Sequence, residues 1–326
     1  MIGRKKSSAL LMGECRVGDR KSSTTTIAGM SESKEEPRAT ANVDTNVVKA
    51  FGEEWTRFRN DSLNEIELVE IFNQYTAIFP WDELPENAVG FDAGCGSGRW
   101  ARFFAPRVGL LHCVDASAAA LDVAREVLAD QCNVKFYVED ISCMSLADES
   151  CDFGYSLGVL HHIPDTERAL GSCVAKLKPG APLLIYVYYD PSSMGIMRSG
   201  LLKMVSGVRW LISRLPSRLK VIVTGFIACV VYFPLARLSR ILARLGRDPS
   251  TIPLFQYRDR SFYVMRNDAL DRFGTRLEKR YSREDVRQLM EGAGLDGVIF
   301  SENPPWWVAV GRRSIEGSPV GGGVPT

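Results

Sequence analysis

Three glycines at alternate positions, Gly94, Gly96 and Gly98, follow the acid Asp92 in the stretch Val-Gly-Phe-Asp-Ala-Gly-Cys-Gly-Ser-Gly. Glycines at this spacing are typical of a backbone that adopts positive φ angles or lets a ligand touch the main chain. Asp92 precedes the turn, where its carboxylate can meet a cationic or hydroxyl-bearing ligand. A helix predicted over residues 99–106 would direct its first N–H groups at the same place. The stretch therefore predicts a ligand site where a strand, a turn and a helix meet.

A dinucleotide site is the first alternative. Its fingerprint, G-x-G-x-x-G, has a third glycine where the helix packs closely beneath a pyrophosphate. Arg99 occupies that position here, and Asp92 would bring a negative charge close to negative phosphate oxygens. A ligand that carries an amino group and a sulfonium fits better. The pattern D-x-G-x-G-x-G resembles motif I of the class I S-adenosylmethionine-dependent methyltransferases.

From Ala88 onward, apolar strand-like runs alternate with helical patterns, which predicts a parallel sheet covered by helices on both faces. The run 110–114 ends in Asp115, one strand after Asp92, so both acids are expected at the carboxyl edge of neighbouring strands. An acid at the end of the second strand can accept both ribose hydroxyls. A role for Asp115 as helix cap is the weaker alternative, because Ser117 already supplies a cap.

Two histidines, His161 and His162, follow the fourth predicted strand, residues 152–158. An oxygen or nitrogen that accepts a methyl group must lose a proton, and histidine titrates near neutral pH. Consecutive residues cannot both face one site, so His162 is the first candidate for a general base and His161 the second. In the alternative, one of them caps the next helix or binds a backbone carbonyl. A carbon acceptor would need less help from a base.

Five sequence segments occur in order, namely D-A-G-C-G-S-G, V-D-A-S, V-E-D-I, L-G-V-L-H-H-I-P-D and K-L-K-P-G-A-P-L-L-I-Y. With them, residues 89–190 resemble the type 11 branch of the class I methyltransferases. The resemblance implies an α/β, Rossmann-like, doubly wound sheet of seven strands, mostly parallel with an antiparallel last strand, and S-adenosyl-L-methionine as the cofactor. It assigns Asp140 to the adenine amino group and Ile141 to the ring face. The cofactor-binding residues that it implies are Asp92, Ala93, Gly94, Gly96, Gly98, Asp115, Ala116, Asp140, Ile141, Leu157 and Gly158.

The C-terminal part is expected to complete the sheet. Ser282 to Asp285 resembles a capping box and predicts the start of a helix that ends near Gly294. Two short strands, 298–300 and 307–311, would follow. Aromatic and basic residues that could bind the methyl acceptor are Tyr188, Tyr189, Tyr257, Arg260 and Tyr263. Their alternative roles are packing and a local salt-bridged surface.

Residues 191–262 are more than a crossover between strands needs, and they predict a large helical insertion after the fifth strand. Residues 191–247 contain ten Lys or Arg and no Asp or Glu, and residues 221–236 are sixteen in a row without charge. A membrane span needs roughly 20 apolar residues, so this run is marginal. Two interpretations stay open. Residues 191–250 form a lid that rests on an anionic membrane surface or covers a lipid-like acceptor, or they cover the substrate in a soluble enzyme.

The remaining parts follow from composition. Residues 1–45 and 314–326 are expected to be disordered. Residues 46–190 should hold N-terminal helices and the cofactor-binding core, and residues 263–313 the C-terminal part of that core. Eight cysteines without a C-x-x-C pair, together with three histidines, predict reduced thiols and no metal site.

A net charge of +1 predicts no general affinity for nucleic acid. The sequence as a whole predicts a methyltransferase of the cytoplasm, or of the cytoplasmic face of a membrane, that methylates an oxygen, carbon or nitrogen of a small or lipophilic acceptor. Two rival classes stay open, a catalytically silent cofactor-binding or membrane-docking protein and a nicotinamide-dependent oxidoreductase. The sequence does not indicate the identity of the acceptor or the oligomeric state.

Overall fold

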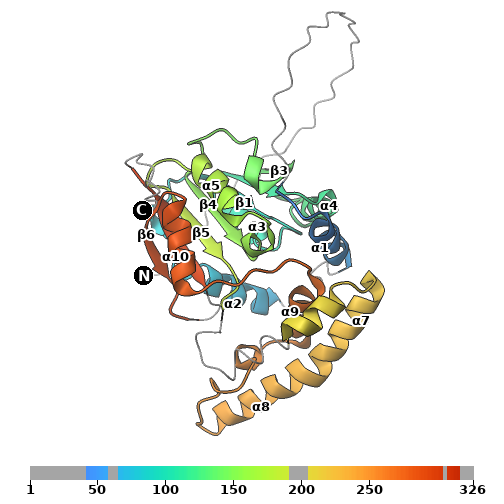
Figure 1. The fold of residues 1–326 in the computed structure, drawn as a ribbon. Helices are drawn as coiled ribbons and strands as arrows, with labels where there is room; N and C mark the ends of the chain where they lie inside the picture. The colour runs from blue at the N-terminus through green and yellow to red at the C-terminus, as the bar shows by residue number, and fades with distance from the viewer. Residues whose placement is uncertain (1–41, 58–64, 191–204, 304–306, 316–326) are drawn as a thin grey trace, which may run out of the picture. The chain divides into compact units, whose positions relative to one another are not determined.

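The computed structural model describes residues 42–57, 65–190, 205–303 and 307–315. A seven-stranded sheet with the order β3-β2-β1-β4-β5-β7-β6 forms its centre (Figure 1). β1 to β5 run parallel, and β7 pairs antiparallel with both β5 and β6. This topology confirms the predicted doubly wound sheet with an antiparallel last strand. The strands are β1 (Val89–Ala93), β2 (Leu110–Asp115), β3 (Val134–Val138), β4 (Phe153–Leu157), β5 (Pro182–Tyr186), β6 (Leu295–Phe300) and β7 (Val308–Arg313).

Helices cover both faces of the sheet, because alternate side chains of a strand point in opposite directions. Phe91 and Ile185 pack with α5 and α10 on one face. Leu111 and Leu184 pack with α2, α3 and α4 on the other. The sheet is therefore buried on both sides, and ligands are left to its carboxyl edge. These helices are α2 (Glu65–Tyr75), α3 (Ala101–Phe104), α4 (Ala118–Val127), α5 (Thr166–Lys176) and α10 (Arg283–Gly292).

Capping side chains begin these helices as the sequence predicts. Ser117 Oγ accepts a hydrogen bond from the N–H of Ala120 at the start of α4 (3.3 Å). The capping box of α10 is confirmed: Ser282 Oγ accepts from the N–H of Asp285 (3.1 Å), and Asp285 Oδ2 accepts from the N–H of Ser282 (2.8 Å). Each exchange satisfies N–H groups that the helix itself leaves unpaired.

Two elements end early. The helix after β1, predicted over residues 99–106, gives way to a 3-10 turn at Ala105–Arg107, because Pro106 has no N–H with which to continue an α-helix. β5 ends at Tyr186, where it lies opposite the last residue of β4, Leu157. Tyr189 lies beyond this end and forms an isolated bridge with Tyr281.

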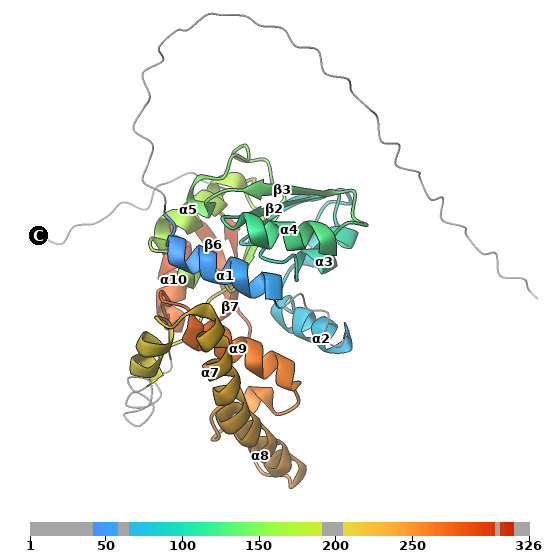
Figure 2. The same cartoon turned by 90° about the vertical axis from the view of Figure 1, so that its right-hand side faces the viewer.

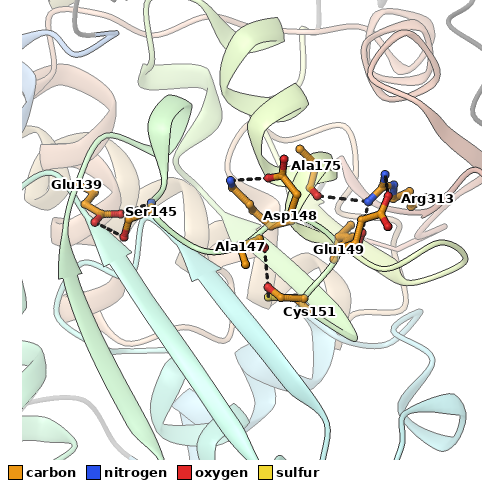
Figure 3. A network of polar contacts seen from close by, with 11 residues as sticks. Glu139, Ser145, Ala147, Asp148, Glu149, Cys151, Ala175 and Arg313 are labelled. Carbon is orange, nitrogen blue, oxygen red and sulfur yellow. Dashed lines mark hydrogen bonds and ion pairs between the residues drawn. The ribbon is translucent and has the colours of Figure 1, made fainter. Parts of the chain in front are cut away.

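Polar contacts tie β7 to the loop that precedes β4 (Figure 3). Arg313 donates to Glu149 Oε1 (2.7 Å) and to the carbonyl of Ala175 at the end of α5 (3.3 Å). One residue before Glu149, Asp148 accepts from Lys176 Nζ (2.7 Å). Exposed ion pairs contribute little individually, but together these contacts connect the last strand with the middle of the sheet.

The N-terminal helix α1 (Thr45–Arg57) lies against the start of α4 (Figure 2). A Cβ atom at Gly52 would lie 2.7 Å from Ser117 Oγ, so the two helices meet closely at this glycine. α1 begins within the segment predicted to be disordered, residues 1–45. The rest of that segment, residues 1–41, and the predicted tail from residue 316 onward lie outside the described residues.

The insertion forms a helical unit with its own apolar core. α7 (Ser217–Ile227), a π-helical turn (Ala228–Tyr232) and α8 (Phe233–Arg244) run on as one helix of 28 residues. α9 (Phe262–Gly274) lies alongside α7 (Figure 2). Buried side chains of both helices meet in a third apolar cluster, which includes Tyr232, Met265 and Phe273. The chain therefore packs α9 with the insertion, although α9 falls almost wholly in the segment 263–313 predicted to complete the core. Residues 191–204 of the insertion lie outside the described residues.

Candidate functional site

The glycine turn after β1 has the backbone that its sequence predicts. The φ angles of Gly94, Gly96 and Gly98 are +89°, +55° and +76°, and residues that carry a Cβ atom rarely adopt such angles. A Cβ atom at Gly94 would also lie 2.4 Å from Val159 Cγ2. The turn is held because the N–H groups of Gly94 and of the next residue donate to the carbonyl of Val114 (2.8 and 3.0 Å). The local sequence thus fixes a main-chain surface at the carboxyl edge of the sheet.

Asp115 at the end of β2 fastens this turn to the start of α4. Its Oδ2 accepts from the N–H of Gly96 (2.9 Å), and its Oδ1 accepts from the N–H of Ser117 (2.8 Å). Burial raises the pKa of Asp115, although these two hydrogen bonds oppose the shift. Each oxygen keeps a second lone pair, so the carboxylate can still accept hydrogen bonds from a ligand.

Asp92 lies beneath the turn, beside Cys113 of β2 and Tyr155 of β4. The residue is 2% exposed, and its Oδ2 has no hydrogen-bond partner among the described residues. Burial raises the pKa of Asp92 from 3.8 to about 8. The side chains of Asp92, Cys95 and Cys113 form a buried group whose potential metal-ligand atoms lie within 4.8 Å of one another. The predicted absence of a metal stays a prediction.

A cavity of about 1680 Å³ opens over the turn and extends to α9. Most residues predicted to bind the cofactor or the acceptor line it, whereas Asp92, Ala93 and Gly98 do not. The structure thus brings together segments that lie far apart in the sequence, and the individual roles stay predictions. The predicted residues in the lining are Gly94, Gly96, Asp115, Ala116, Asp140, Ile141, Leu157, Gly158, His162, Tyr188, Tyr189, Tyr257, Arg260 and Tyr263.

The segment before α1 also lines the cavity and was not predicted to take part. The backbone N–H of Asn42 donates to Asp140 Oδ2 (2.7 Å), and its side-chain amide donates to Ser142 Oγ (2.7 Å) and to the carbonyl of Asp165 (2.6 Å). Asn42 Oδ1 in turn accepts from the N–H of Asp165 (2.8 Å). Asn42 and Phe51 both line the cavity. The start of α1 is thereby bound to the loops that follow β3 and β4.

The two histidines differ sharply in position. His162 lines the cavity, and its Nδ1 donates to the carbonyl of Leu277 (2.7 Å), which leaves Nε2 as the proton-accepting nitrogen. His161 is fully buried outside the lining and stacks on Tyr188 with ring centroids 4.1 Å apart. Burial lowers the pKa of both imidazoles, that of His161 well below its usual value. Both rings are therefore neutral at pH 7.

A cluster of polar residues on α9 also lines the cavity, and the sequence did not predict that these residues belong to the site. Its members are Asn267, Asp268, Asp271 and Arg272, and Tyr75 of α2 lies near them. The spacing of these residues places them on one side of a helix. Only the fold shows that this side meets a cavity instead of water.

Comparisons with known proteins agree with this geometry. Residues 91–185 match the family model Methyltransf_11, described as a methyltransferase domain. Phosphoethanolamine N-methyltransferase 2 of Caenorhabditis elegans is 35% identical over 100 residues, which are 30% of this chain and 23% of that protein. Ubiquinone biosynthesis O-methyltransferase of Coxiella burnetii is 30% identical over 93 residues, 28% of this chain and 40% of that protein. The chain thus spans less than half the length of either relative.

Solved methyltransferase structures resemble the chain at lower identity. The methyltransferase of Methanosarcina mazei is 18% identical, with a TM-score of 0.44, and the match covers 72% of this chain and 96% of that one. The N-methyltransferase NodS of Bradyrhizobium japonicum, solved with S-adenosyl-L-homocysteine, is 20% identical with a TM-score of 0.38. That match covers 48% of this chain and 78% of NodS.

The sheet order, the antiparallel β7 and the glycine turn after β1 define a class I, Rossmann-like methyltransferase fold. Residues 91–185 match the Methyltransf_11 model of methyltransferase domains, for which S-adenosyl-L-methionine is the cofactor. The residues present fit that cofactor: Asp115 faces the cavity, and the unpartnered carboxylate oxygen of Asp92 lies behind the turn, where a cationic ligand would stabilise it. Neither rival class, the nicotinamide oxidoreductase or the silent binder, is favoured by these matches.

Proposed function

We propose that this chain transfers the methyl group of S-adenosyl-L-methionine to a small acceptor held between the sheet edge and α9. The observation that carries the proposal is the continuous cavity described above. The glycine turn, Asp115, several tyrosines and residues of α9 all line it. At about 1680 Å³ it exceeds the roughly 300–1,000 Å³ of an ordinary ligand pocket, which leaves room for cofactor and acceptor together.

The bound cofactor supplies a methyl carbon already activated by the sulfonium. The chain therefore has to bind, orient and exclude water. In this proposal Asp115 accepts the ribose hydroxyls, Asp140 and Ile141 hold the adenine, and the glycine turn receives the amino-acid part. Alignment of two reactants in a closed pocket can contribute about 7–11 kcal/mol to the lowering of the barrier. The two relatives are named as an N- and an O-methyltransferase, which supports nitrogen or oxygen as the accepting atom.

Label transfer tests the proposal. The full chain is incubated with methyl-labelled S-adenosyl-L-methionine and an extract of its host cell, and label is followed into aqueous and organic fractions. We expect transfer by the wild type, and loss of transfer with weakened cofactor binding in Asp115→Asn. Cofactor binding without transfer to any fraction would favour the silent binder.

We further propose that the enzyme works on the cytoplasmic face of an anionic membrane. The helix Ser217–Arg244 is, among the described residues, long and apolar enough to cross a membrane by length and composition. Ile222 and Phe226 on its outer side are 65% and 66% exposed, whereas Thr224 and Tyr232 are buried against the rest of the insertion. An amphipathic helix with one side packed on its own protein suits the membrane surface, not the interior.

The charges of the insertion support the same placement. Arg218 stands at one end of the uncharged run, and Arg240, Arg244 and Arg247 stand at the other. Basic residues beside an exposed apolar face complement the negative surface potential of anionic lipids. A lipophilic acceptor would then reach the cavity from the bilayer, in which case label would appear in the organic fraction.

A further inference from the structure

α9 presents to the cavity two oxygen atoms that have no hydrogen-bond partner. Asn267 is 6% exposed, and within the described part of the chain neither its Oδ1 nor Asp271 Oδ1 receives a hydrogen bond. Both residues line the cavity. They are one helical turn apart, which places their Cβ atoms about 5–6 Å from each other. Buried acceptors without donors are unfavourable, so the pair indicates a ligand that donates to both.

The neighbouring carboxylate is already engaged. Asp268 Oδ2 accepts from the hydroxyl of Tyr232 (2.8 Å) and lies 3.4 Å from Nε of Arg272, one turn further along α9. Asp268 therefore has a structural ion pair and hydrogen bond. Asp271 is the acid on this helix that keeps an oxygen for a ligand.

Aromatic rings line the same cavity. The ring centroids of Tyr75 and Tyr186 lie 4.8 Å apart, and those of Tyr186 and Tyr188 lie 5.9 Å apart. All three tyrosines line the cavity, and Tyr186 pairs with Leu157 across the sheet, next to the predicted cofactor residues. The faces of such rings attract cations. Two of them, Tyr75 and Tyr188, lie close enough to Asp271 for its charge to act on their hydroxyls.

We infer that the methyl acceptor is a primary or secondary amine whose nitrogen is bound by Asn267 and Asp271, and that Asp271 takes the proton from this nitrogen. The inference rests on the proposed function. A hydroxyl has one proton to donate and would satisfy one of the two oxygens. An ammonium group has two or three N–H bonds, satisfies both oxygens and places its charge against the tyrosine rings.

The transfer balances as follows. An N–H bond of the ammonium breaks, the proton passes to the carboxylate of Asp271, and the electron pair stays on nitrogen. That pair forms the new N–C bond with the methyl carbon while the C–S bond breaks and its electron pair remains on sulfur. The product nitrogen carries the positive charge that the sulfur loses, and Asp271 ends as a carboxylic acid until it returns its proton to solvent.

The surroundings of Asp271 suit a proton acceptor that works near neutral pH. Burial and the nearby charge of Asp268 raise the pKa of Asp271 to about 7, while Arg99 and Arg272 oppose the rise and Glu278 adds to it. Burial also raises the pKa of the facing phenols, so the tyrosines stay neutral. Because the ionised form is the one that accepts a proton, transfer should accelerate as pH rises through about 7.

Binding of a matched pair of probes tests the site without any methyl transfer. Benzylamine and benzyl alcohol differ chiefly in the ammonium group, and their affinities for the full chain are compared at about pH 8, where Asp271 is ionised. We expect the amine to bind at least about tenfold more tightly to the wild type and to Asp296→Asn, an exposed control on β6. Asp271→Asn should remove the preference and Asn267→Ala should reduce it. Equal binding of the two probes, or an undiminished preference in Asp271→Asn, would overturn the inference.

Label transfer then tests the chemistry. Asp271→Asn should slow transfer from methyl-labelled S-adenosyl-L-methionine by at least about 100-fold, lose the acceleration near pH 7 and keep its cofactor affinity. Treatment of the small-molecule extract with an amine-acylating reagent should abolish labelling by the wild type. Persistent labelling after acylation would overturn the amine assignment. An absence of labelling in every fraction, with the amine preference intact, would contradict the proposed methyl transfer and leave the amine site standing.

Discussion

At the scale of single residues, Asp92 combines burial with an oxygen that has no hydrogen-bond partner among the described residues. Burial disfavours the ionised form, and the nearby charge of Asp115 adds to this effect, so the pKa of Asp92 rises to about 8. A cationic ligand near the glycine turn would stabilise the carboxylate and lower that pKa again. Cofactor binding and ionisation of Asp92 are then linked, and each favours the other.

We therefore predict that affinity for S-adenosyl-L-methionine rises with pH up to about 8 and then levels off. Below that pH, binding must expel the proton of Asp92, which costs free energy, and proton release should accompany binding. Calorimetric titration at several pH values, in buffers of different ionisation enthalpy, measures both quantities. S-adenosyl-L-homocysteine, which lacks the sulfonium charge, should show a weaker dependence. An affinity that does not change with pH in the wild type would contradict the link.

The same residue predicts how stability depends on pH. The folded state holds a proton on Asp92 up to about pH 8, whereas the unfolded chain releases it near 3.8. The free energy of unfolding of the ligand-free protein therefore decreases as pH rises between these values, because the folded state binds the extra proton. Asp92→Asn lacks this titration, so its stability relative to the wild type should increase from about pH 5 to about pH 9. Denaturant unfolding of both proteins across this range checks the trend, and a constant difference would refute it.

At the scale of elements, α1 and the segment before it line the cavity. The helix packs on α4 at Gly52, and Asn42 binds its start to the loops after β3 and β4. These contacts join the chain's N-terminal segment to two loops that carry predicted cofactor residues. We therefore expect a ligand bound against this segment to leave faster when the contacts are weakened.

Asn42→Ala should shorten the residence time of the cofactor. The change removes three side-chain hydrogen bonds, each of which contributes about 0.5–1.5 kcal/mol. We expect dissociation of S-adenosyl-L-methionine to accelerate by about 10-fold, measured by stopped-flow fluorescence. Asn46→Ala is the matched control, because Asn46 lies in the first turn of α1, four residues further on, with its side chain exposed. Equal rates of cofactor dissociation for both variants would show that the contacts of Asn42 do not retain the cofactor.

Most elements could be predicted because local chemistry determines them. Three local features act within a few residues of themselves: the capping box at Ser282, the proline at 106 and the glycines of the turn. The structure shows the expected result of each, namely a helix start, a 3-10 turn and positive φ angles. The sequence ranks His162 above His161 without geometry for that choice, because only the fold of the 3-10 turn Leu160–His162 shows which of the two lines the cavity. Asp271 and Asn42 escaped prediction for a related reason. Their neighbours come from distant segments, and helical spacing does not indicate what a helix face will meet.

At the scale of the whole molecule, the apolar outer side of the helix Ser217–Arg244 predicts binding to anionic vesicles. The full chain should sediment with vesicles of phosphatidylglycerol and phosphatidylcholine, and binding should weaken in high salt because part of it is electrostatic. Ile222→Ser together with Phe226→Ser should reduce partitioning by at least about 10-fold. Full burial of each apolar side chain contributes at most about 1.5–3 kcal/mol to the free energy of binding.

A matched control separates this effect from general hydrophobicity. Ile66 of α2 is 68% exposed but lies outside the insertion, so Ile66→Ser should leave partitioning unchanged. If the wild type stays in the supernatant while the anionic vesicles sediment, the proposed membrane location is wrong. The insertion would then be a lid of a soluble enzyme.

The position of β7 in the sheet has a consequence for biosynthesis. β5 is complete at residue 186, but the strand that covers its open edge begins only at residue 308, after the entire insertion. While the ribosome makes that segment, the nascent chain exposes both an unpaired apolar strand edge and the long apolar helix. Unpaired edges and late, distant pairings favour aggregation and slow folding. Newly made chains should therefore depend on chaperones until translation has passed β7.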